Sequence, residues 1–115
     1  MANIIHEGQH AAEFILYDEG DYSRDAVVIS SAAGALVPGT LLGKVTASGK
    51  YVAYSNAAND GSEVARAINL FAVPDSAADQ TVVAITRQAE VMGSALTGLD
   101  AAGKADLLAA GIVVR

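Results

Sequence analysis

The stretch Thr40-Leu41-Leu42-Gly43-Lys44-Val45-Thr46, followed by Ala47-Ser48-Gly49-Lys50 and Tyr51-Val52-Ala53-Tyr54, predicts a β-hairpin. Two runs rich in β-favouring residues flank a short turn that contains glycine, which is the pattern of two antiparallel strands. Residues 56–61 are rich in Asn, Asp and Gly, which tolerate the left-handed backbone of a longer turn. The middle of the chain is therefore expected to be an antiparallel strand pair followed by a turn.

Further strands are predicted on both sides of this hairpin. Residues 62–67 are also compatible with the start of a helix, but the apolar run that follows favours a strand from Val64 onward. In the strand at 80–87, Val83 and Ile85 are expected on one face. The predicted strands are Ala26–Ser30, 64–73, 80–87 and 112–115, after an apolar run at 14–17, and turns or loops separate them at 18–21, 31–39 and 74–79.

One helix is predicted, at residues 100–110. Asp100 is a suitable N-cap, and Gly111 supplies the left-handed residue that ends a helix. The apolar residues at helical spacing are Ala101, Ala105, Leu108 and Ile112. The fold class is therefore α+β: a small, β-rich single domain at residues 14–115 with one C-terminal helix. Residues 1–13 are polar and aperiodic, and we expect them to form a flexible N-terminal arm.

Composition limits the classes to which the protein can belong. The chain has 115 residues, 52% of them hydrophobic and 17% charged, with no cysteine and a net charge of -6. This length suits one domain. The arginines are scattered, which disfavours nucleic-acid binding, and the absence of cysteine excludes disulfides and thiolate metal sites. We find no signal-peptide pattern and no apolar run of membrane-spanning length, so we expect a protein made in the cytoplasm, whose surplus apolar surface meets a partner.

The motif His6-Glu7-Gly8-Gln9-His10 matches the H-E-x-x-H pattern of zinc hydrolases. That chemistry needs a helix that places both histidines on one face, with the glutamate as general base. Here the motif contains a glycine, stands near the chain terminus, and lacks a second helix to carry a third ligand. The preferred interpretation is an arm sequence without a metal site.

Other catalytic patterns are equally incomplete. The segment Gly39–Val45 resembles a phosphate loop, but it has three residues between its glycines and lacks the Ser or Thr that meets magnesium. Both glycines are instead expected to be strand-edge residues. No serine has a histidine on a rigid element to activate it. The acid pairs in turns, Asp18 with Glu19 and Asp75 with Asp79, are expected to be solvated. Tyr17, Tyr51 and Tyr54 are expected to be half-buried strand residues. We predict no enzyme activity and no cofactor.

Several short blocks in one order give the chain a family resemblance. These blocks are Ser23-Arg24-Asp25, Leu42-Gly43-Lys44, Gly49-Lys50-Tyr51-Val52, Asp60-Gly61-Ser62-Glu63-Val64-Ala65 and Ala109-Ala110-Gly111-Ile112-Val113-Val114-Arg115. With them the chain resembles the bacteriophage head decoration proteins of the lambda type. The resemblance implies a structural virion protein that binds as a homotrimer to the major capsid protein. Its site is the outer surface of the expanded head at three-fold positions, where it stabilises the shell against the pressure of packaged DNA.

By the same resemblance, the N-terminal arm orders on contact with the capsid. The residues assigned to this capsid contact are Ile4, Ile5, His6 and Phe14. An arm that carries apolar residues is able to add a strand to an exposed sheet edge of a partner. Arg66, Arg87 and Arg115 are candidates for ion pairs between subunits.

Two alternatives from other classes remain open at this stage. One is a small metal-dependent hydrolase that uses His6, Glu7 and His10. The other is an oligomeric binding module unrelated to viruses, which the composition permits equally well.

Overall fold

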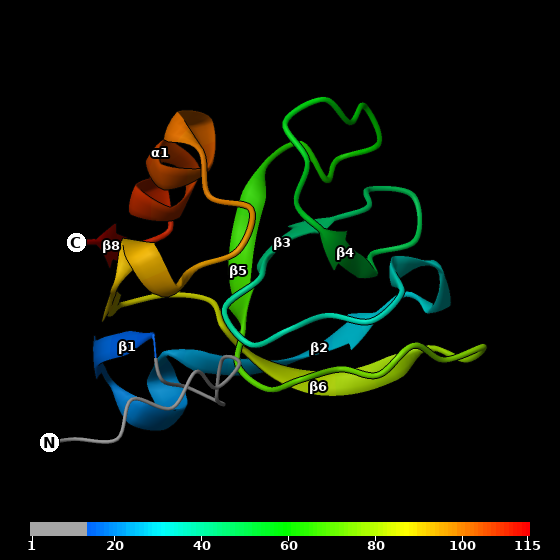
Figure 1. The fold of residues 1–115 in the computed structure, drawn as a ribbon, viewed down its shortest axis with the longest axis horizontal. Coiled ribbons are helices and arrows are strands. Elements are labelled where there is room, and N and C mark those ends of the chain that lie inside the picture. The colour runs from blue at the N-terminus through cyan, green and yellow to red at the C-terminus, as the bar shows by residue number, and fades with distance from the viewer. Residues whose placement is uncertain (1–13) are drawn as a thin grey trace, which may run out of the picture.

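Five strands close into a barrel in residues 14–115, the part of the chain that the computed structural model describes (Figure 1). The strands are β2 (Arg24–Ile29), β3 (Leu41–Lys44), β4 (Tyr51–Ala53), β5 (Ala65–Asn69) and β6 (Gln80–Ile85). Their order around the barrel is β2-β4-β3-β5-β6. β2 pairs with β6 along its whole length, but it meets β4 only where Ile29 lies opposite Tyr51. The barrel wall is therefore barely closed between β2 and β4.

The predicted hairpin is formed by β3 and β4. Leu42 lies opposite Ala53 and Lys44 opposite Tyr51 in antiparallel register, which confirms the prediction. The turn between the strands holds Gly49 at a φ of 73°. Glycine adopts this backbone region without the steric cost that a Cβ atom would add. Local turn chemistry therefore sets the register of this pair.

The other predicted strands are also present, with shifted ends. The predicted segment 26–30 overlaps β2, which begins two residues earlier, at Arg24. The segments 64–73, 80–87 and 112–115 contain β5, β6 and β8 (Ile112–Val114) respectively. β5 begins at Ala65, so the strand interpretation of this region is confirmed over the helical one. The predicted turn at 18–21 overlaps the short 3-10 helix η1 (Gly20–Tyr22), and the predicted loop at 31–39 contains η2 (Ser31–Ala33).

A second, three-stranded sheet lies beside the barrel (Figure 1). Its order is β1-β7-β8, where β1 is Ile15–Asp18 and β7 is Ala89–Val91. Sequence reasoning missed β7, because three residues are too few to show a hydrophobic period. The strand exists through long-range pairs, such as Ala89 with Ile112 in parallel register. This sheet joins the first and last strands of the described chain.

The helix α1 (Ala101–Ala109) forms where the sequence predicts it. The Asp100 carboxylate accepts a hydrogen bond from the Gly103 N–H over 2.6 Å, which is an N-cap. Gly111 follows the helix at a φ of 87°. Both predicted helix ends are confirmed. No helix within the described residues has the length and apolar character needed to cross a membrane.

The predicted apolar stripe of this helix is wrong. Ala101, Ala105 and Leu108 are exposed, whereas Gly103 and Leu107 are the buried residues of α1. The physical reason is the closeness of the packing at Gly103, where an added Cβ would lie 3.1 Å from Leu41 Cδ2. The residue without a side chain therefore faces the barrel, and alanine is exposed at little cost because it is the best helix former.

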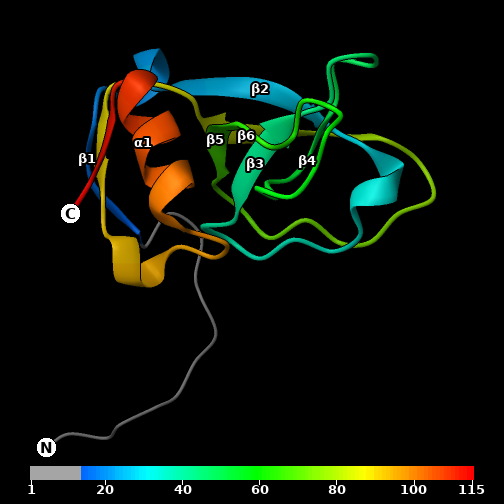
Figure 2. The same ribbon diagram turned by 90° about the horizontal axis from the view of Figure 1, so that it is seen from above.

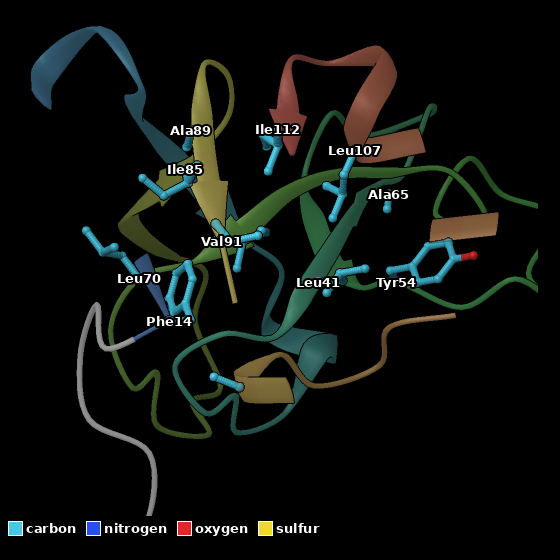
Figure 3. Packing of buried hydrophobic residues seen from close by; sticks show 12 residues of the cluster. Phe14, Leu41, Tyr54, Ala65, Leu70, Ile85, Ala89, Val91, Leu107 and Ile112 are labelled. Carbon is cyan, nitrogen blue, oxygen red and sulfur yellow. The ribbon is translucent and has the colours of Figure 1, made fainter. Parts of the chain in front are cut away.

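Barrel, sheet and helix share one hydrophobic core (Figure 3). Fully buried side chains reach it from the start of the chain, Phe14, from the middle, Ile85 and Val91, and from the end, Leu107 and Ile112. A smaller cluster, which includes Ile29, Leu42 and Val73, fills the remaining part of the barrel. Complete burial of one such side chain stabilises the fold by roughly 1.5–3 kcal/mol. The described chain is thus a small, compact β-rich domain with one helix.

Candidate functional site

Three loops without a charged side chain form one face of the molecule, which we name the uncharged face. The loops are residues 34–40, 70–74 and 92–99, and none contains Asp, Glu, Lys, Arg or His. Backbone hydrogen bonds join them: the Leu36 N–H donates to the Val73 carbonyl over 2.8 Å, and the Thr97 N–H donates to the Gly39 carbonyl over 2.9 Å. In Figure 2 the segment that enters β3 meets the segment that leads into α1. A surface without charge stands out in a chain with a net charge of -6.

Each loop of the uncharged face exposes one large apolar side chain. Val37 is 50% exposed, Phe71 is 46% exposed and Met92 is 38% exposed. Small residues surround them, and the exposed neighbours Ala35, Ala72 and Thr97 carry no charge. A single exposed apolar residue needs no explanation, but three of them on hydrogen-bonded loops without charge indicate an interaction site. The uncharged face is therefore suited to a partner surface that is itself uncharged.

The described chain begins beside this face. The Met92 N–H donates a hydrogen bond to the Phe14 carbonyl over 2.8 Å, so residues 1–13 connect to the domain next to an apolar residue of the uncharged face. The Phe14 side chain is fully buried and lies next to Leu70 in Figure 3. It anchors the domain core, and its assignment as a capsid contact stays a prediction. The other assigned contacts, Ile4, Ile5 and His6, lie outside the described residues.

Two of the three arginines considered for contacts between subunits are paired within the chain. Arg87 forms an ion pair with Asp25, and its guanidinium lies 5.5 Å from the centre of the Tyr22 ring. Arg115 Nε lies 3.0 Å from the Glu90 carboxylate. Arg66 is exposed and makes no ion pair with any residue in 14–115. It is the arginine of the three that remains available to a partner.

The turn carboxylates make ordinary hydrogen bonds and ion pairs, with one exception. Asp18 pairs with Arg24 over 2.8 Å, and Glu19 accepts a hydrogen bond from the Tyr17 hydroxyl over 2.9 Å. The side chain of Lys50 holds the pKa of Asp79 below its usual value. Asp75 has no hydrogen bond or ion pair with the described residues. Within residues 14–115 no group of three acidic or histidine side chains is arranged to hold a metal ion.

The tyrosines differ in exposure. Tyr51 is half-buried, as expected, but Tyr17 is 53% exposed and Tyr54 only 7% exposed. Burial, together with the hydrogen bond that the Tyr54 hydroxyl donates to Asp100 over 2.8 Å, raises the pKa of Tyr54 to about 12. Because Asp100 also caps α1, this hydroxyl attaches the helix to the barrel. It has a structural role and keeps its proton at neutral pH.

The remaining motifs do not gather into a catalytic site. Residues 6–10, which carry the H-E-x-x-H pattern, lie outside the described residues. Gly43 lies inside β3, where an added Cβ would stand 2.4 Å from the Ser62 carbonyl oxygen. This glycine permits a close approach of two backbone segments, which explains it without a bound phosphate. It was expected at a strand edge and instead lies within the strand.

Two comparisons with known proteins bear on the site. The family model of bacteriophage lambda head decoration protein D matches residues 4–112. A search of curated proteins found no match. The family match covers the uncharged face and β1 to β7 and α1, together with part of the segment before Phe14.

Proposed function

The chain belongs to the bacteriophage lambda head decoration protein D family, and on that premise we propose that it binds the outside of an expanded phage head as trimers at three-fold positions. The family gives the chain a structural role on the virion capsid. The proposal adds the position, the trimeric state and the effect, which is to stabilise the shell against the pressure of packaged DNA. The partner is the major capsid protein.

The uncharged face is the observation that supports this proposal most strongly. It exposes Val37, Phe71 and Met92 and carries no charged side chain. Residues 1–13 connect to the domain beside Met92, through the backbone hydrogen bond to Phe14. One side of the domain therefore offers both an apolar surface and the attachment point of the N-terminal segment. In the proposal this side faces the shell.

The N-terminal segment, residues 1–13, acts as a capsid-binding arm in this proposal. On binding, the stretch with Ile4, Ile5 and His6 would add a strand to an exposed sheet edge of the capsid protein. Main-chain hydrogen bonds supply affinity in this mode of binding, and alternate side chains supply selectivity. Fixing each backbone residue costs about 1–2 kcal/mol, so the arm contact needs the apolar contact of the uncharged face beside it.

Stabilisation of the shell follows from binding alone. A protein that binds only the expanded shell favours that state by about 2.7 kcal/mol per site when its free concentration is 100 times its dissociation constant. Many identical sites on one shell multiply this free energy. The net charge of -6 disfavours a position against packaged DNA, which supports the outer surface of the head. We also propose that the protein is made in the host bacterial cytoplasm.

The proposal is tested by sedimentation with expanded phage heads that lack their decoration protein. We expect the full chain to co-sediment until a fixed number of sites is filled. A variant that lacks residues 2–13 should keep the circular dichroism spectrum of the full chain and lose co-sedimentation.

Two results would each contradict a different part of the proposal. Failure of the full chain to co-sediment would remove the decoration function. Unchanged binding of the shortened chain would leave decoration in place and remove the arm mechanism. Ile4→Ala with Ile5→Ala in the full chain is the finer test, because it keeps the length of the arm and removes only its apolar side chains.

A further inference from the structure

A groove lies along β2 beside the point where β2 meets β4 at a single residue pair, and we name it the β2 groove. Its volume is about 740 Å³, and its wall includes Val28 on β2, Tyr51 on β4 and Ala109 at the end of α1. Strand β2 forms one rim. Along this edge of β2, only Ile29 pairs with another strand within residues 14–115, and residues 24–28 have no strand partner there. The groove therefore offers unpaired backbone groups as well as apolar side chains to an extended segment.

The β2 groove holds two cations without an acidic partner. Five charged residues line it, and two of them, Asp25 and Arg87, pair with each other. The Asp106 carboxylate accepts a hydrogen bond from the Ala65 N–H over 3.1 Å. Lys44 and Arg66 remain, and neither forms an ion pair with the described part of the chain. The groove therefore has a local excess of positive charge in an acidic protein.

One acidic side chain complements this excess. Asp75 is exposed. Among the carboxylates whose side chains the structure describes, it is the one that makes no hydrogen bond and no ion pair. It lies in the irregular segment between Val73 and β6, shortly before the exposed residues Ala77 and Ala78. This carboxylate, which has no charged partner and has small apolar residues near it, complements a groove with apolar walls and two cations without an acidic partner.

We propose that the β2 groove of one copy receives the segment around Asp75 of the next copy, with the Asp75 carboxylate between Lys44 and Arg66. This inference rests on the proposed function, in which three copies meet on the head. A groove and a protruding segment are different surfaces of one chain, so their contact is heterologous. Heterologous contacts close into a ring when the rotation between copies permits it. One kind of contact then joins all three copies.

The experiment uses the absence of cysteine in the natural chain. Asp75→Cys and Arg66→Cys are introduced together, and the protein is bound to expanded heads and oxidised, or treated with a short bis-maleimide. We expect dimers and trimers on a non-reducing gel, with the trimer as the largest covalent species because the ring is closed. Asp75→Cys with Lys104→Cys is the matched control, since Lys104 is exposed and does not line the groove. It should stay monomeric on the gel.

A second pair of variants tests the charges themselves. Arg66→Glu alone and Asp75→Lys alone should each weaken association of the copies about tenfold or more, and the two together should recover most of the loss. A merely destabilised fold would not recover in this way. Full occupancy of the heads by the cysteine variant without any cross-linked product would overturn the proposal and leave the proposed function intact. If the natural chain fails to bind heads, the proposed function fails instead, and cross-linking of the concentrated free protein then decides the groove contact.

Discussion

The uncharged face and the β2 groove are both suited to binding a partner, but they differ in charge. The face has three loops without a single charge and exposes Val37, Phe71 and Met92. The groove holds five charged side chains, of which Lys44 and Arg66 lack an acidic partner. An apolar contact gains free energy from buried area and tolerates salt, whereas a charged contact gains specificity and is screened by salt. The difference indicates two partners: the shell for the face and a second copy for the groove.

The largest effect is expected when a charge is placed on the uncharged face. Phe71→Asp would force a carboxylate against a partner surface that offers it no cation, and such burial costs several kcal/mol. We expect the affinity for expanded heads to fall by at least about 100-fold, which corresponds to about 2.7 kcal/mol. Co-sedimentation titrations measure this. Leu108→Asp is the control, because Leu108 is 61% exposed on α1 and lies outside both surfaces.

Removal of apolar area from the same face should have a smaller effect. Met92→Ala deletes methylene-sized groups worth about 0.8 kcal/mol each when fully buried, and Met92 is only partly exposed before binding. We expect roughly tenfold weaker binding to heads, equivalent to about 1.4 kcal/mol. Leu108→Ala should leave the affinity unchanged. Equal losses for both variants would show that the shell contact is not confined to the uncharged face.

Salt should affect binding at the two surfaces differently. Raising the salt concentration from roughly 0.05 M to 0.5 M shortens the screening length several-fold, so it weakens contacts between charges. We expect the affinity for heads to change by less than about threefold, while the association of copies through Lys44, Arg66 and Asp75 weakens more. Light scattering of the concentrated protein and co-sedimentation with heads measure the two quantities. A steep salt dependence of head binding would remove the distinction between the surfaces.

The smallest effect is expected from acid. A hydrogen bond from Arg87 lowers the pKa of Asp25, and Lys50 lowers that of Asp79. Because these folded-state pKa values lie below the value of 3.8 for the free side chain, the carboxylates stabilise the fold above that pH and lose the effect as the pH falls through the folded values. Urea denaturation should give a constant free energy of unfolding from neutral pH to about pH 5, and a decrease below pH 4.

The same acid experiment compares a charged position with an uncharged one. Asp79→Asn should make the decrease slightly shallower, because this variant lacks one of the titrating groups. Phe71→Ala should shift the whole curve without changing its slope, since the uncharged face contains no titrating side chain. A changed slope for Phe71→Ala would mean that a charged group packs against this face.

Features set by neighbours in sequence were predictable, and features set by distant pairs were not. The hairpin follows from Gly49 and its flanking runs, and the ends of α1 follow from Asp100 and Gly111. The closure of the barrel through β2 and β6, and the whole of β7, depend on pairs far apart in the chain. Periodicity also failed to distinguish Leu107 from Leu108, because the close approach at Gly103 decides which side of α1 is buried.

The candidate site was only partly visible in the sequence. The uncharged loops appear there as stretches without charge, which sequence reasoning did not use as a signal. That these stretches form one face follows only from long-range hydrogen bonds, such as that from Leu36 to Val73. Phe14 was assigned to the capsid contact, and in the described chain its side chain occupies a core position. The assignments of Ile4, Ile5, His6 and Phe14 to the capsid contact stay predictions.

A reconstruction of expanded heads decorated with the natural chain, by electron cryomicroscopy, tests the central claim most directly. The account predicts added density at the three-fold positions on the outside of the shell, with three copies per position. The loops that carry Val37, Phe71 and Met92 should face the capsid protein, and the β2 groove should lie between copies. Density in which these loops point away from the shell, or in which the chain lies inside the head, would contradict the account.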